Sequence, residues 1–520
     1  METPRSRAAV PDPGDDSVCA ASQDHALRPG DVVDRAIRGA VSLGGGQAAA
    51  QVLNIAGAIV LARVLTPAEF GLVAIFTFFL GFLTALGDLG LAMSLVRQPA
   101  EPSDHDFRVV CTFQNVVATI VVLAACAATP WVLGAYGLPI GTWWWLPAMA
   151  LAILADSVRF RPLVRLERQL RFERIGAIEV AQAVAFNAVL LPLAVSGYGA
   201  GAFPVAVFVR SAFGAVVARL LGPSVRGWSW HWAIARRYLA FGLPYQGVHL
   251  VTVIRTSVVP VFVGLLLGGA AVGRLEWAAM VAGFPLTGLI LLQRLYVGTF
   301  SRLRAHPDKL SEFVTSIVSM AHAIVAPAAV LTLVLIDPIV RLVFGPAWLP
   351  AVPLFRWLWL ACLVIPTTAP LTGLLHAFGH SRVVLAVSLA ASIATWLVAV
   401  PLLFAMGEPG IAIATLTLHA GGLAIWIAAR RLVAFALLKP VAVVWACAAP
   451  AGVLAWWWHA RSPLATLPDL LLCGAVAAAL YAVLVLAAGA VLSKPAREVM
   501  MLVGRRVPMA AALRSPGGDL

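Results

Sequence analysis

Long apolar stretches separated by short polar segments run through almost the whole chain. A helix needs about 20 apolar residues to cross a bilayer. Lipid-exposed backbone must also satisfy its own hydrogen bonds, and the chain lacks the alternating pattern of a membrane barrel. The pattern predicts an all-α polytopic membrane protein of about fourteen transmembrane helices. The predicted spans are 40–62, 70–95, 109–134, 139–157, 175–196, 198–221, 239–267, 271–296, 312–336, 349–375, 383–405, 409–429, 437–458 and 466–492.

The segment "RVLTPAEFGL" (63–72) interrupts the apolar pattern with residues typical of a helix start. Thr66 can cap a helix, Pro67 suits the first helical position, and Glu69 stands where a capping box has its acid. The sequence therefore predicts that one helix ends near Leu65 and that the next begins at Pro67.

A weak internal repeat suggests two lobes of six helices. An offset of 202 residues lays Gly71 on Gly273, and an offset of 210 lays Gly197 on Gly407. Such repeats are common in transporters. We expect the lobes to face each other in a V around a central cavity. The predicted divisions are a disordered tail (1–37), an N-lobe (38–222), a C-lobe (223–431), two extra C-terminal helices (432–493) and a second tail (494–520).

Composition and charge support a membrane protein and predict its orientation. The chain is 61% hydrophobic and 12% charged, and its net charge is +13. Nucleic-acid binding is not indicated, because the basic residues are confined to short loops. If both termini are cytoplasmic, 30 of the 37 lysines and arginines fall on inner segments and four on outer loops. This asymmetry is the one that positive-inside topology predicts.

The sequence shows no sign of a catalytic centre. No lysine follows a glycine, so there is no phosphate-binding loop. The predicted outer loops are too short to carry a catalytic domain, and the six cysteines are scattered. We therefore expect no catalytic residues, no metal, no cofactor and no enzymatic activity.

Polar residues recur on one face of two predicted spans. Gln47, Gln51 and Asn54 have helical spacing in the first span, and a matching set lies in the seventh. The offset of 202 lays Gln47 on His249 of that set. Polar groups inside a membrane usually line functional interiors. The stripes predict two sides of a wet cavity, and the alternative is interhelical hydrogen bonding in a dry bundle. The seventh-span set is Gln246, His249 and Thr256.

Three ionisable residues are further candidates. Arg210, near the centre of the sixth span, predicts an anion contact or a buried ion pair. Arg255 would face the cavity only if its helix is kinked near Pro244 or Pro260. Asp88 could bind a coupling cation, or it could be an ordinary acid at a helix end.

The predicted cytoplasmic loop 159–174 is basic and aromatic. It could recruit anionic lipid or a pyrophosphate head group, or it could serve only to set topology. The candidate residues are Arg161, Arg165, Arg168 and Arg171.

Five segments, in order, resemble the polysaccharide-biosynthesis flippases of the multidrug/oligosaccharidyl-lipid/polysaccharide exporter superfamily. They extend over about four-fifths of the chain. They are "LARVLTPAEFGLVAIFTFFLGFLTALGDLGLAMSLVRQ", "RPLVRLERQLRFERIGAIEVAQA", "YLAFGLPYQG", "PDKLSEFVTSI" and "PIVRLVFGPAWLPAVPLFRWL". The chain departs from the family pattern in its seventh and eighth spans, where Val259 and Leu275 replace an expected acid and an aromatic polar residue.

The resemblance implies alternating access in a bacterial inner membrane. The implied substrate is an undecaprenyl-pyrophosphate-linked oligosaccharide for surface polysaccharide or lipopolysaccharide. The implied partners are this substrate, membrane lipids and a polysaccharide polymerase or export machinery. Two alternatives stay open at this point. One is a drug/cation antiporter of the same superfamily, and the other is a membrane-embedded glycan polymerase or ligase.

Overall fold

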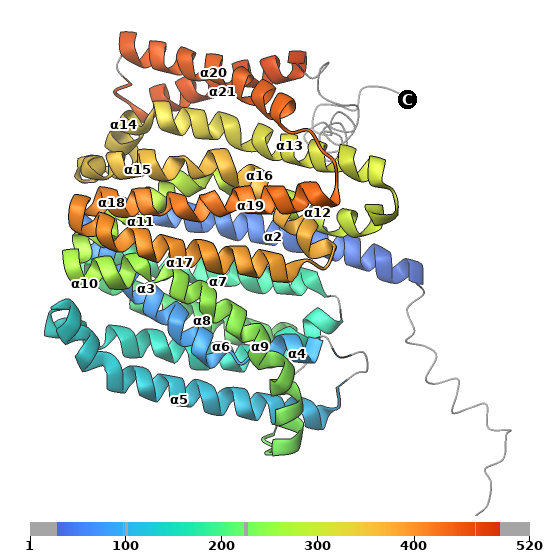
Figure 1. Cartoon of the computed structure of the whole chain (residues 1–520). Helices are drawn as coiled ribbons and strands as arrows, with labels where there is room; N and C mark the ends of the chain where they lie inside the picture. Colours follow the sequence, from blue (N-terminus) through green and yellow to red (C-terminus); the bar gives the residue numbers. More distant parts are fainter. Residues whose placement is uncertain are drawn as a thin grey trace, which may run out of the picture.

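The protein is a bundle of long helices whose axes run in roughly the same direction (Figure 1). The computed structural model describes residues 29–96, 98, 102–169, 171–222, 227–462 and 464–488, and every regular element within these ranges is helical. Residues 1–28 and 489–520 lie outside the described residues, so the expected disorder of the two tails stays a prediction. The first helix begins at Pro29, before the expected lobe boundary at residue 38.

Six long helices and one short one build the N-lobe. They match the first six predicted spans. Gly197 and Gly199, both with positive φ, break the chain between the fifth and sixth spans. The elements are α2 (Pro29–Val64), α3 (Pro67–Gly87), α4 (Leu91–Val96), α5 (Asp104–Tyr136), α6 (Trp145–Arg168), α7 (Phe172–Leu193) and α8 (Ala202–Leu221).

The C-lobe helices are more often interrupted. Two predicted spans, 239–267 and 271–296, each consist of two α-helices joined by a π or 3-10 turn. The elements are α9 (Trp232–Thr256), η4 (Val258–Val263), α10 (Gly264–Leu267), α11 (Gly269–Gly283), η5 (Phe284–Gly288), α12 (Leu289–Arg302), α13 (Pro307–Val334), α14 (Ile336–Ile339), η7 (Val340–Phe344), η8 (Pro346–Ala351), α15 (Val352–Trp359), α16 (Ala361–Ala377), α17 (Ser381–Met406), α18 (Glu408–Ala414) and α19 (Leu416–Leu432).

The last two helices, α20 (Leu438–Arg461) and α21 (Leu467–Ala488), lie at the edge of the bundle beside α13 (Figure 1). Within the described residues, nine helices are long and apolar enough to cross a membrane, or ten if one pair bent by 41° is a single span. The difference from fourteen has a local cause. The segment Phe172–Leu221 contains two predicted spans, and three others are broken or carry charge at one end.

The capping box predicted after Leu65 is confirmed. The Thr66 hydroxyl oxygen accepts the Glu69 backbone N–H at 3.3 Å, and the Glu69 carboxylate accepts the Thr66 N–H at 2.9 Å. These bonds satisfy N–H groups that a helix start leaves without partners. We call the end of the bundle that carries Thr66 the outer end, following the predicted orientation. It lies at the left of Figure 1.

The two lobes meet in a reciprocal contact between α3 and α11. A Cβ on Gly71 would lie 1.7 Å from the Gly269 oxygen, and one on Gly273 would lie 1.8 Å from the Pro67 oxygen. Residues 67 and 269, like 71 and 273, are 202 positions apart. A two-fold relation between repeats produces this arrangement, because residue i then contacts the counterpart of j while j contacts the counterpart of i. The contact supports the repeat proposed from sequence.

Hydrogen bonds from C-lobe and N-lobe side chains join the lobes at the outer end. The Arg63 guanidinium donates to the Leu342 and Val343 carbonyls at 2.7 and 3.1 Å. The Trp348 indole N–H donates to the Ala62 carbonyl at 2.7 Å. The Trp348 ring also meets Phe70 edge to face, with ring centroids 5.2 Å apart. The outer ends of the lobes are therefore in close contact in this conformation.

A polar cavity at the boundary of the lobes

The polar stripe predicted on the first span lines a cavity of about 570 Å³. Gln47, Gln51 and Asn54 face it from α2, and Arg210 faces it from α8. The structure thus brings together four candidates from helices that are distant in sequence. We call this space the polar cavity. Its other polar lining residues are Arg159 of α6, Glu179 and Gln182 of α7, and Thr287 of η5 in the C-lobe.

Hydrogen bonds fix most of these side chains. The Gln47 amide donates to Glu179 Oε1 at 3.3 Å, and Arg159 donates to Gln182 Oε1 at 2.9 Å. Arg159 also pairs with Asp156 on its own helix at 3.1 Å. Gly214 of α8 leaves room for Gln182, because a Cβ there would lie 2.2 Å from its amide nitrogen. Most polar side chains of the wall are therefore held by partners within the protein.

Arg210 differs from Arg159 in its surroundings. Its side chain is exposed, and no described residue gives its guanidinium a hydrogen bond or an ion pair. Its fork of N–H donors can bind a phosphate or carboxylate in two-point fashion. The polar cavity thus combines one unpaired cation with amide groups suited to sugar hydroxyls.

The stripe predicted on the seventh span does not line this cavity. Gln246 is buried, and its amide donates to the Ala85 carbonyl of α3 at 2.8 Å. His249 and Thr256 are exposed, and the Thr256 hydroxyl donates to Val253 within its own helix. The side chain of Arg255 lies outside what the structure describes.

Backbone packing explains this difference from the prediction. α9 lies against α3 and α4, and a Cβ on Gly90 would be 2.3 Å from the Gly242 oxygen. Gln246 lies one turn further along α9 than Gly242, so this close approach brings its side chain into contact with α3. Equivalent positions in the two repeats therefore have different surroundings.

Asp88 is placed at a helix end, away from the polar cavity. It follows the last residue of α3, and its carboxylate accepts the Gly90 N–H at 3.0 Å. Gly90 has a φ of 67°, which suits glycine in a tight turn. This arrangement is the ordinary turn-forming role of an aspartate. The coupling of transport to a cation at Asp88 gains no support from this geometry.

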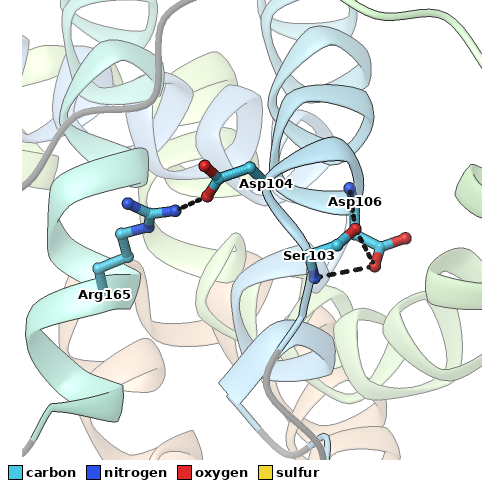
Figure 2. Close-up of polar contacts among 4 residues, drawn as sticks. All are labelled: Ser103, Asp104, Asp106 and Arg165. Atoms are coloured by element: carbon cyan, nitrogen blue, oxygen red, sulfur yellow. Dashed lines mark hydrogen bonds and ion pairs between the residues drawn. The ribbon is translucent and has the colours of Figure 1, made fainter. Parts of the chain in front are cut away.

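Most of the predicted basic loop 159–174 is helical, because α6 continues to Arg168. Arg165 forms an ion pair with Asp104 at the start of α5, next to the capping box of Ser103 and Asp106 (Figure 2). Its guanidinium also lies 4.8 Å from the centre of the Phe107 ring. Arg165 therefore ties α6 to α5.

Arg168 has a similar structural role, and Arg171 does not. The Arg168 guanidinium donates to the carbonyls of Leu95 and Val96, the last two residues of α4, and of Gln98 just beyond it, at 2.7–3.2 Å. Arg161 also interacts within the protein. Arg171 is exposed. Of the four arginines proposed to recruit a head group, Arg171 is the one that the structure leaves accessible.

Sequence reasoning missed four polar residues of the polar cavity: Arg159, Glu179, Gln182 and Thr287. Arg159 was assigned to a loop because its apolar stretch ends at residue 157, whereas α6 extends eleven residues further. Glu179 and Gln182 have helical spacing in the fifth span, which is the same signal that identified the α2 stripe.

Comparisons with known proteins agree with this architecture. A family described as polysaccharide biosynthesis protein matches residues 60–353. The lipopolysaccharide biosynthesis protein WzxC of Escherichia coli (strain K12) is 23% identical over 339 residues, which cover 62% of this chain and 66% of WzxC. The chain thus spans slightly less than two thirds of that relative.

Two solved structures share the fold. The lipid II flippase MurJ in an inward closed conformation has a TM-score of 0.67 and 13% identity, over 87% of this chain and all of the MurJ chain. An inward-facing multidrug resistance MATE family transporter of the MOP superfamily has a TM-score of 0.58 and 14% identity, over 74% of this chain and 94% of the transporter. At these identities the likeness establishes the fold alone.

Proposed function

We propose that this chain, which belongs to the polysaccharide biosynthesis protein family, flips a lipid-linked oligosaccharide across the bacterial inner membrane by alternating access. The substrate class is an undecaprenyl-pyrophosphate-linked sugar. Both termini are cytoplasmic in this proposal, so the sugar moves from the inner to the outer leaflet. No covalent step is needed, and the product would pass to a polymerase or export machinery for a surface polysaccharide.

The observation that carries the proposal is the unpaired Arg210 in the polar cavity. A charge deep in a membrane protein is costly unless it serves a ligand or a partner. A pyrophosphate can bind the Arg210 guanidinium directly, while Gln51 and Asn54 offer donors and acceptors for sugar hydroxyls. The apolar tail can stay in lipid while the sugar occupies the cavity.

Flipping can be measured with purified protein in sealed liposomes that contain a fluorescent lipid-pyrophosphate-linked sugar. Transfer is followed by adding a glycosidase to the outside. We expect transfer well above that of protein-free liposomes. Arg210→Gln should slow transfer about tenfold, because one charge-assisted contact to the phosphate is lost. Arg219→Gln is the matched control, since Arg219 is exposed at the end of the same helix and outside the cavity.

The same liposomes test the alternative of a drug/cation antiporter. Glu179 in the polar cavity is the observation that favours this alternative, because it could attract a cationic substrate. Uptake of a fluorescent organic cation, abolished by Glu179→Gln, together with no movement of any lipid-linked sugar, would replace the flippase proposal. Equal flipping by Arg210→Gln and Arg219→Gln would remove the role assigned to Arg210.

A further inference from the structure

A second cavity lies at the outer end of the bundle, where α20 packs on α13 beside α14 and α15. Its volume is about 590 Å³, and it shares no lining residue with the polar cavity. Gly452 makes it possible for α20 to pack closely on α13, because a Cβ at this position would lie 2.5 Å from the Val330 side chain. We call this space the outer groove.

The outer groove changes from apolar to polar along its length. On the α13 side, Val330 and Leu333 are followed by Asp337. On the α20 side, Val453 is followed by His459, about 9 Å further along the helix axis at 1.5 Å per residue. Both helices run toward the outer end. In the proposed membrane orientation, the apolar half would lie at the depth of acyl chains and the polar half at the depth of head groups.

The polar half contains one cation, one anion and an imidazole ring. Arg356 and Asp337 are 3.6 Å apart, and their side chains are 58% and 51% exposed. A strong charge-assisted hydrogen bond is shorter, at about 2.7–2.9 Å, so both groups have capacity for another partner. His459 Nδ1 is buried and accepts or donates no hydrogen bond within the described residues. Trp456 lines the groove and is 62% exposed.

We propose that the outer groove binds one phospholipid with a zwitterionic phosphoethanolamine head group. The lipid phosphate lies at Arg356, its ammonium group at Asp337, and an acyl chain along Val330, Leu333 and Val453. A lipid with a net negative head group would face the Asp337 carboxylate without a compensating cation. A choline head group has no N–H to donate to Asp337. A free sugar would leave the apolar half of the groove unfilled.

The test uses the full-length protein in detergent, incubated with equal amounts of dioleoyl phosphatidylethanolamine and dioleoyl phosphatidylglycerol. Native mass spectrometry counts the lipids that stay bound. We expect one phosphatidylethanolamine to be retained in preference to phosphatidylglycerol. Arg356→Gln should lower its retention about tenfold, because a charge-assisted contact to the phosphate is lost. Asp337→Asn should instead abolish the preference between the two lipids.

Arg341→Gln is the matched control, because Arg341 is exposed on η7 at the same end of the protein but does not line the outer groove. The thermal midpoint of each variant without added lipid shows whether it is folded. If the two groove variants lower the midpoint but keep the lipid ratio of the wild type, the ion pair is only structural and the proposal is wrong. Equal retention of both lipids by the wild type would also overturn the proposal. So would a thermal midpoint that rises with the soluble sugar chitobiose but not with lipid.

Discussion

Single arginines of this chain have clearly different roles, although the sequence presents all of them as cations near or within a membrane. Arg210 faces the polar cavity, and no described residue forms a hydrogen bond or an ion pair with its guanidinium. Arg165 and Arg168 are bound to acceptors of the protein itself. The residue type of Arg210 and its approximate depth in the sixth span predicted its place in the cavity. The other two depend on where α4 ends and where α5 begins, which is a property of the folded structure.

Arg168→Leu should destabilise the fold. Its guanidinium satisfies carbonyls at and just beyond the end of α4, and the loss of hydrogen bonds from a charged group costs about 1.5–3 kcal/mol. The thermal midpoint in detergent measures the effect. Arg171→Leu is the control, and its midpoint should match that of the wild type because Arg171 is exposed. Equal midpoints for the two variants would show that Arg168 does not support α4.

Whole helices explain why one half of the predicted site was found and the other was not. The period of polar residues in α2 predicted its face toward the polar cavity, because a helix presents positions i, i+4 and i+7 together. The same reasoning failed for α9, because the approach of Gly242 to Gly90 turns Gln246 onto α3. Contacts between elements decide which side of a polar helix meets the cavity, and a single sequence does not encode them locally.

The contact between α3 and α11 should not tolerate a side chain. Gly71→Ala would place its Cβ against the Gly269 carbonyl, and overpacking of this kind typically costs about 1–3 kcal/mol. Gly81→Ala is a matched control on α3, because a Cβ there meets no atom within 4 Å. Thermal unfolding of the two variants gives the comparison. A stability of Gly71→Ala equal to that of Gly81→Ala would contradict the close approach of the lobes.

At the scale of the whole molecule, the sequence predicted the fold class well. Apolar length predicted helices at all fourteen spans, because lipid leaves few other structures possible. The seventh span breaks at η4, which contains Pro260, one of the two prolines at which the sequence allowed a kink, and the eighth span breaks at η5, which contains Pro285. The contacts of Arg63 and Trp348 across the lobes show one conformation of a protein that, in our proposal, needs at least one other.

The most direct test of the proposed mechanism is to lock the outer contact and measure flipping. Arg63→Cys and Leu342→Cys, in a chain in which Cys19 and Cys126 are serine, can be joined across the lobes by a short bis-maleimide. The liposome assay then compares cross-linked protein with the same protein carrying two singly reacted maleimides. Alternating access predicts that the cross-link stops transfer of the lipid-linked sugar, while the singly reacted protein transfers it normally. Undiminished transfer by fully cross-linked protein would contradict the account.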